Sequence, residues 1–106
     1  MSEPLNNNES EGLKNFQRGL ELDAAGKTAE AVEVYRTAVT VCPDMAPAHF
    51  NLGLALALLG QRDQAIRSWR KAVWLDHNYR TELTKALGLD DELGETEANP
   101  LGTSLQ

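Results

Sequence analysis

The sequence predicts an all-α protein in which antiparallel helix pairs stack on one another. Three observations lead to this fold class. Similar residues recur at a spacing of 34, apolar side chains follow helical periodicity within each copy, and glycine or proline stands where each helix must end. A chain of 106 residues with 42% hydrophobic and 25% charged residues has the size and composition of a single folded domain.

The repeat becomes visible when the sequence is shifted against itself by 34 residues. The aligned pairs are Phe16 with Phe50, Gly19 with Gly53, Leu22 with Leu56, Gly26 with Gly60, Ala31 with Ala65, Val32 with Ile66, Tyr35 with Trp69, Ala38 with Ala72, and Val39 with Val73. A fixed period of this length is the signature of a repeat architecture, in which each copy buries its apolar face against the next.

The first copy is expected to contain a helix from about residue 9 to residue 25 and a second from residue 28 to residue 41. Gly26 ends the first helix, because glycine adopts the left-handed conformation past a helix end at little steric cost. Thr28 is the expected N-cap of the second helix. Glu30 then falls in the first turn, where the helix dipole favours an acid.

The second copy is expected to contain helices from residue 46 to residue 59 and from residue 62 to residue 75. Gly60 ends the first of these, and Pro43 interrupts the chain between the two copies. Residues 78 to 87 again place apolar side chains at helical spacing. They predict a fifth helix that caps the open end of the second repeat.

Small and aromatic residues recur at matched places in both copies. We expect the glycine and the first alanine of each copy to lie where the two helices of one repeat cross closely, and the aromatic residue to fill the gap between repeats. The residues assigned to this packing are Gly19, Ala31, Tyr35, Ala38, Gly53, Ala65, Trp69 and Ala72.

The formal net charge of -6 is concentrated at the ends of the chain. Residues 1 to 11 contain three acids and residues 89 to 106 contain five, and neither segment has a base. Such segments bury too little apolar surface to offset chain entropy. The predicted organisation is a disordered tail over 1–8, a folded domain over 9–88 with repeats at about 12–45 and 46–79 and a cap at about 79–88, and an acidic disordered tail over 89–106.

These residues resemble the tetratricopeptide repeat (TPR) family, whose pattern is Trp-x2-Leu-Gly-x2-Tyr, then Ala-x3-Phe, then Ala and Pro. The second copy reads His49-x2-Leu52-Gly53-x2-Leu56, then Ala65-x3-Trp69, then Ala72 and His77. The first copy reads Asn15-x2-Arg18-Gly19-x2-Leu22, then Ala31-x3-Tyr35, then Ala38 and Pro43. Asn15 and Arg18 depart from the apolar preference of the pattern. The resemblance covers residues 12 to 78 and implies a short right-handed TPR solenoid.

The resemblance also implies a function. TPR proteins bind a peptide or a helix of a partner protein in a concave groove lined by the first helix of each repeat, and so act as scaffolds or adaptors without catalysis. The groove positions of the family correspond here to Leu13, Phe16, Gln17, Leu20, Phe50, Asn51, Leu54, Leu58 and Lys85. Most are apolar, which suits an amphipathic helix or an extended apolar segment. We expect Asn51 to bond the ligand backbone and Lys85 to set its orientation.

Other interpretations of this apolar stripe stay open. The same residues serve as core if the ends of the chain cover them, since apolar helical stripes are usually buried. They pair between two copies if the protein is a homodimer, because two repeats bury less surface than the three or more that solenoids usually need. The substitution Phe50→Asp distinguishes these roles. It should abolish partner binding and leave the fold intact if Phe50 is a binding residue, and it should disrupt the fold if Phe50 belongs to the core.

Nucleic-acid binding is disfavoured. A basic cluster occurs on the expected fourth helix at Arg62, Arg67, Arg70 and Lys71. However, the neighbouring Trp69 stands at the buried aromatic position, Arg67 has Glu33 one repeat earlier as an expected partner, and the acidic ends oppose a phosphate backbone. Trp74 occupies a position that the family leaves exposed and polar, so it is a candidate for a second contact point.

An enzyme is also disfavoured. Cys42, His49 and His77 do not have the spacing of a zinc site, and Cys42 falls at a helix C-terminus, where the dipole raises the pKa of a thiol. We therefore expect no catalysis, no cofactor and no metal. The first residues show no secretory signal and no apolar run is long enough to span a membrane, so a cytoplasmic location without membrane insertion is expected.

Overall fold

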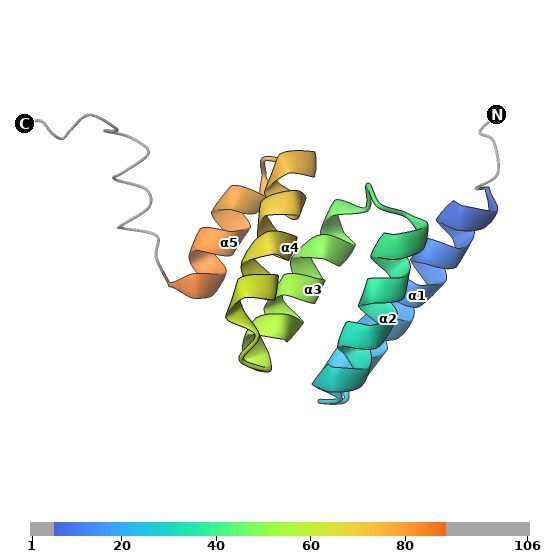
Figure 1. Ribbon diagram of the computed structural model, residues 1–106, viewed down its shortest axis with the longest axis horizontal. Helices are drawn as coiled ribbons and strands as arrows, with labels where there is room; N and C mark the ends of the chain where they lie inside the picture. Colours follow the sequence, from blue (N-terminus) through green and yellow to red (C-terminus); the bar gives the residue numbers. More distant parts are fainter. Residues whose placement is uncertain (1–5, 89–106) are drawn as a thin grey trace, which may run out of the picture. The chain divides into compact units, whose positions relative to one another are not determined.

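The computed structural model describes residues 6 to 88, and five α-helices follow one another within this range (Figure 1). They are α1 (Asn7–Ala24), α2 (Thr28–Val41), α3 (Ala46–Leu58), α4 (Arg62–Leu75) and α5 (Tyr79–Leu87). No strand occurs among the described residues. The predicted all-α fold is confirmed, and no predicted helix end is in error by more than two residues.

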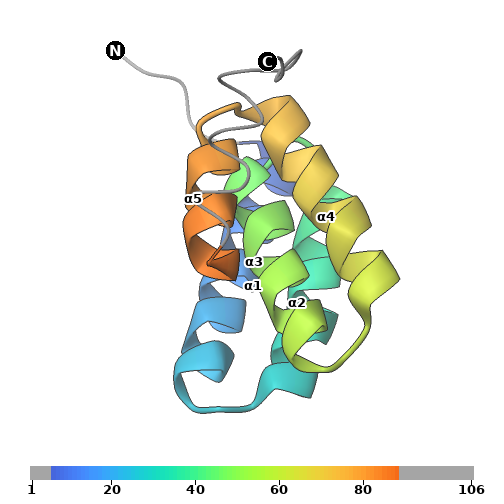
Figure 2. The ribbon, with the colours of Figure 1, turned by 90° about the vertical axis from the view of Figure 1, so that its left-hand side faces the viewer.

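The chain divides into two units after Asp76. In the first unit, α1 packs on α2, α2 on α3, and α3 on α4. Figure 2 shows α1 and α3 in one layer of this unit and α2 and α4 in the other. The unit is therefore two antiparallel helix pairs stacked through α2 and α3, which are the two predicted repeats. Helix α5 belongs to the second unit.

Helix α1 begins two residues earlier than expected because Asn6 caps it. The Asn6 side chain accepts a hydrogen bond from the backbone N–H of Glu9 at 2.7 Å, and the Glu9 carboxylate accepts one from the backbone N–H of Asn6 at 3.1 Å. This reciprocal pair is a capping box, with asparagine in place of serine or threonine. The tail predicted over 1–8 therefore overlaps α1 at Asn7 and Asn8. Residues 1–5 and the predicted tail over 89–106 lie outside the described residues.

The turns inside the two repeats have the same geometry. Gly26 has a φ of 78° and Gly60 has a φ of 81°, as the sequence predicted for residues that follow a helix end. In the first turn, the N–H of Gly26 bonds the carbonyl of Asp23 at 2.9 Å, and the N–H of Lys27 bonds that of Leu22 at 2.8 Å. This is the Schellman motif, which satisfies carbonyls at the end of a helix. The turn at Gly60 repeats both bonds.

Thr28 is the first residue of α2, so the expectation that it caps this helix is wrong. The N-cap is Lys27, whose side chain makes no capping hydrogen bond. Because the six-residue Schellman motif extends through Lys27, that residue already stands at the start of α2, and its carbonyl accepts the N–H of Ala31 at 2.9 Å. Glu30 lies in the first turn as expected.

The aromatic residue of each repeat packs against the glycine of its own repeat. A Cβ added at Gly19 would overlap the Tyr35 ring, and one added at Gly53 would overlap the Trp69 ring. Each glycine thus makes room for a ring from the second helix of the pair. The expectation that the rings fill the gap between repeats did not include this contact within the repeat. The eight packing residues are all buried: Gly19, Ala31, Tyr35, Ala38, Gly53, Ala65, Trp69 and Ala72.

The polar atoms of the two rings differ in their partners. The Tyr35 hydroxyl donates a hydrogen bond to Asp23 Oδ2 at 2.6 Å. One repeat later, Asp23 corresponds to Ala57, which has no acceptor in its side chain. The buried Nε1 of Trp69 has no hydrogen-bond partner among the described residues. The first repeat therefore carries a part-buried hydrogen bond that the second repeat lacks.

A polar contact joins the two repeats across the stack. The Arg36 guanidinium donates to the side-chain oxygen of Gln64 at 2.7 Å, which links α2 to α4. The expected pair between Glu33 and Arg67 is not formed. An ion pair joins Arg18 to Glu21 on one exposed face of α1, at 3.5 Å.

Candidate functional site

Helix α3 is apolar on nearly every side. Its sequence, APAHFNLGLALAL, has polar side chains only at His49 and Asn51. A helix that is apolar on all sides has to be surrounded by other elements to be fully buried, whereas an ordinary surface helix buries only one apolar stripe. Leu52 and Leu56 are buried, but Leu58 is 76% exposed. Part of α3 therefore presents an apolar surface to solvent.

Phe50 and Leu54 continue this surface along α3, because they precede Leu58 at intervals of four residues. Both are half-buried. The neighbouring Asn51 is also half-buried, and its side-chain amide donates to the carbonyl of Pro47 at 3.0 Å. This bond fixes the Asn51 side chain and uses one of its two N–H donors.

Helix α1 contributes a second set of apolar side chains. Leu13 and Leu20 are 39% and 41% exposed, and their separation of seven residues places them on one face of the helix. Phe16 lies between them and is half-buried. Its ring centroid is 6.1 Å from that of Tyr35, at an interplanar angle of 42°. Phe16 thus contributes to both the core and the surface.

The two helices that carry these six side chains, α1 and α3, lie in the same layer of the first unit (Figure 2). We call them the first-layer apolar residues: Leu13, Phe16, Leu20, Phe50, Leu54 and Leu58. Of the remaining predicted groove residues, Gln17 is exposed on α1 and Asn51 lies on α3. Lys85 is exposed on α5, in the second unit.

Two family models match this chain. One, described as TPR repeat, matches residues 19–60, and the other, described as tetratricopeptide repeat, matches residues 46–79. The chain belongs to the tetratricopeptide repeat family. No curated protein matches the chain. TPR repeats generally mediate protein–protein interactions, and the family is typically non-catalytic.

Leu59 is an exposed apolar residue of α3's C-terminal end that the sequence did not lead us to include among the groove residues. It is the C-cap of α3 and is 41% exposed, next to Leu58. The sequence feature that indicates its exposure is the pair of leucines directly before the helix-ending Gly60. Adjacent residues at a helix end point in different directions, so the pair brings apolar surface to solvent beside the turn.

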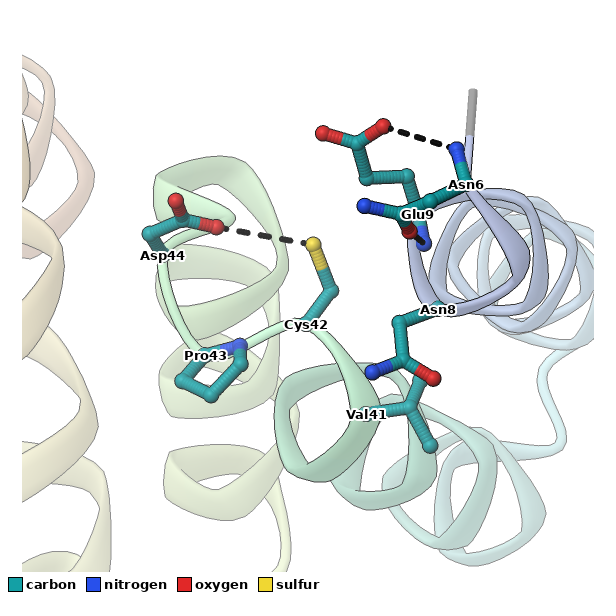
Figure 3. Close-up of a pocket in the computed structure, with 7 residues that line it drawn as sticks. All are labelled: Asn6, Asn8, Glu9, Val41, Cys42, Pro43 and Asp44. Carbon is teal, nitrogen blue, oxygen red and sulfur yellow. Dashed lines mark hydrogen bonds between the residues drawn. The ribbon is translucent and has the colours of Figure 1, made fainter. Parts of the chain in front are cut away.

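The second TPR helix α2 ends at a surface pocket that contains the single cysteine (Figure 3). The pocket has a volume of about 330 Å³ and is lined by Asn6, Asn8, Glu9, Val41, Cys42, Pro43 and Asp44. The Cys42 thiol donates to Asp44 Oδ1 at 3.5 Å. Burial, followed by the hydrogen bond and negative charge of Asp44, raises the pKa of the Cys42 thiol. A thiol that stays protonated at neutral pH is a poor nucleophile.

His49 is engaged with the loop between the repeats. Its Nε2 lies 2.8 Å from the carbonyl oxygen of Pro43 and donates to it in the neutral ring. Burial lowers the pKa of His49, the Pro43 carbonyl opposes that change, and the charge of Lys71 adds to it.

The described range contains no group of three or more His, Cys, Asp or Glu side chains that could hold a metal ion. No helix in that range is long and apolar enough to cross a membrane.

Proposed function

We propose that this TPR protein is a scaffold or adaptor whose first-layer apolar residues bind a peptide or a helix of a partner protein. The observation that carries the proposal is the exposure of large apolar side chains on the first helix of each repeat, above all Leu58. Removing apolar surface from water contributes roughly 25 cal/mol per Å², so a partner that covers these side chains gains free energy.

The spacing of these residues suits a helical or extended ligand. Phe50, Leu54 and Leu58 follow one another by about one helical turn, and Leu13 and Leu20 lie about two turns apart. A partner helix with apolar side chains at i, i+4 and i+7 presents the same interval. Asn51, held by its bond to Pro47, is the proposed donor to the ligand backbone through its second N–H.

The test is a comparison of exposed variants that keep the fold. Leu58→Asp and Leu13→Asp each place a charge among the first-layer apolar residues. Ala29→Asp is the matched control, since Ala29 is exposed on α2 and the added charge is the same. Leu58 is preferred to Phe50 because Phe50 is half-buried, so a charge there also perturbs the core.

Wild type and variants are immobilised, and the proteins they retain from a lysate are quantified by mass spectrometry. The leading candidate is then purified and titrated directly. We expect Leu58→Asp and Leu13→Asp to weaken its binding about tenfold or more, which corresponds to about 1.4 kcal/mol, without changing helical circular dichroism. Ala29→Asp should bind like wild type. Equal binding by all four proteins would refute the proposal.

Self-association through the same residues is a second candidate. It is favoured by the presence of two repeats where stacked repeats usually number three or more, which leaves apolar surface without a neighbouring repeat. A standard interface buries about 800 Å² on each partner. Light scattering at micromolar concentration distinguishes the candidates. A wild-type dimer that becomes a monomer in Leu58→Asp supports self-association, and a monomer at all concentrations eliminates it.

A further inference from the structure

Helix α4 carries a second exposed surface, of different chemistry. Arg67, Arg70, Lys71 and Trp74 follow the spacing i, i+3, i+4 and i+7, so they share one face of the helix. All four are exposed, and Trp74 is 72% exposed. We call these four residues the basic stripe. They are distinct from the buried residues of α4, which include Trp69.

The charges of the basic stripe are not neutralised within the described part of the chain. None of its three cations forms an ion pair there. The Lys71 ammonium instead lies 4.9 Å from the centroid of the Trp74 ring. Such a cation–π contact keeps the indole beside the positive charges. Three cations and a large aromatic surface are thus gathered on a protein whose net charge is -6.

The positive region is short. From residue 67 to residue 74 the helix rises about 10 Å. Asp63, in the first turn of α4, places negative charge beyond the N-terminal end of the stripe. An extended segment of about three residues has the same length. The stripe therefore matches a short anionic ligand better than a long one.

We propose that the basic stripe docks a short acidic segment of a partner protein. Carboxylates of the segment bind Arg67 and Arg70, whose planar guanidinium groups match a carboxylate with two parallel hydrogen bonds. An apolar or aromatic side chain of the segment covers the exposed indole of Trp74. The ligand consequently has a direction, with its acids toward the N-terminal end of α4 and its apolar residue toward the C-terminal end.

A nucleic acid fits this surface less well than an acidic peptide. Its charge continues at every nucleotide, so a nucleic acid longer than the stripe leaves most of its phosphates without a cation of this face to bind. An acidic peptide engages only the three cations and the indole. The proposal goes beyond the proposed function, because it concerns α4 in the other layer and does not involve the first-layer apolar residues.

The test uses the full chain and a synthetic, fluorescein-labelled peptide in which two glutamates precede a phenylalanine. Binding is followed by fluorescence anisotropy. We expect saturable binding that weakens about tenfold in Arg67→Gln/Arg70→Gln, which removes two ion pairs with the peptide, and about tenfold in Trp74→Ala, which removes the aromatic contact. Arg62→Gln removes a cation from another face of α4 and is the matched control, with less than about a twofold effect. Leu58→Asp should bind the peptide like wild type, which separates this proposal from the proposed function.

Several results would overturn the inference. One is the lack of saturable binding at about 1 mM peptide, and another is equal binding of a peptide with glutamines in place of its glutamates. Tighter binding of a single-stranded DNA oligonucleotide, or of vesicles containing phosphatidylserine, would assign the stripe to a different ligand. Binding that requires replacement of the five acids in residues 89–106 by amides would show that the chain's own acidic segment occupies the stripe.

Discussion

The hydrogen bond between Tyr35 and Asp23 allows the packing of the first repeat to be measured as a free energy. The Tyr35 hydroxyl donates to Asp23 Oδ2 at 2.6 Å and joins α2 to the last turn of α1. Tyr35→Phe keeps the buried ring against Gly19 and removes this bond. A hydrogen bond to a charged group contributes about 1.5–3 kcal/mol. We therefore expect the variant to lose about 2 kcal/mol of unfolding free energy at neutral pH, and its Tm to fall by about 8–16 °C.

The assay is urea unfolding followed by circular dichroism, in a cycle of wild type, Tyr35→Phe, Asp23→Ala and the double variant. If the two side chains act as a bonded pair, the double variant is less destabilised than the sum of the single variants, by about 1–2 kcal/mol. Additive losses, within about 0.3–0.5 kcal/mol, would refute the assignment of stability to this bond.

The pH dependence provides a second check. Burial, followed by the hydrogen bond to Asp23 and its charge, raises the pKa of Tyr35 above the usual value of roughly 10. The folded protein therefore retains the phenolic proton at a pH where the unfolded chain loses it. The stability contributed by protonated Tyr35 is complete below about pH 10 and declines as pH rises further, by up to about 1.4 kcal/mol per pH unit. The stability advantage of wild type over Tyr35→Phe should shrink above pH ~10. An advantage that is the same at pH 8 and pH 11 would contradict this cause.

Variants at two further positions test a close helix contact and a helix cap, each by thermal and urea unfolding. Gly53→Ala gains about 1 kcal/mol of helix propensity, but its Cβ overlaps the Trp69 ring, and overpacking costs about 1–3 kcal/mol, so we expect a net loss of up to about 2 kcal/mol. A variant more stable than wild type would contradict the close contact. Asn6→Ala removes the acceptor of the capping box and should cost about 1 kcal/mol, whereas Asn6→Ser should retain most of the stability. Equal losses in the two Asn6 variants would show that the side-chain oxygen does not cap α1.

The start of α1 shows how a composition argument can mislead. The acidic and asparagine-rich beginning of the chain predicted a tail through residue 8. Asn6 and Glu9, however, have the three-residue separation of a capping box, and this local signal places the helix start at Asn7. The information was in the sequence, but average composition does not report the spacing of individual side chains. Local geometry also moved the N-cap of α2 from the predicted Thr28 to Lys27, because the preceding glycine turn extends through Lys27.

The exposure of the candidate binding residues could be predicted only in part. The 34-residue register placed the first-layer apolar residues on the first helix of each repeat, but periodicity does not say how much of each side chain its neighbours cover. Phe16 and Phe50 occupy matched positions and are both half-buried, whereas Leu20 and Leu54, also matched, differ in exposure. Leu54 lies on the central helix α3, which packs against both α2 and α4, and Leu20 lies on α1, which packs against α2. The exposed fraction of two side chains at matched repeat positions therefore depends on which neighbouring helices pack against their own helix.

The sequence by itself determined the helices, their turns and the repeat, because glycine conformation, helix periodicity and a fixed 34-residue interval are local or regular properties of the chain. Tertiary structure alone decided that Tyr35 and Trp69 lie against the glycines of their own repeats, and that the Tyr35 hydroxyl has an acceptor while the Trp69 N–H has none among the described residues. It also decided how far Leu58 and Trp74 remain exposed, at 76% and 72%. These outcomes depend on which surfaces meet when helices pack, and contacts between distant residues are not encoded in the spacing of any one helix.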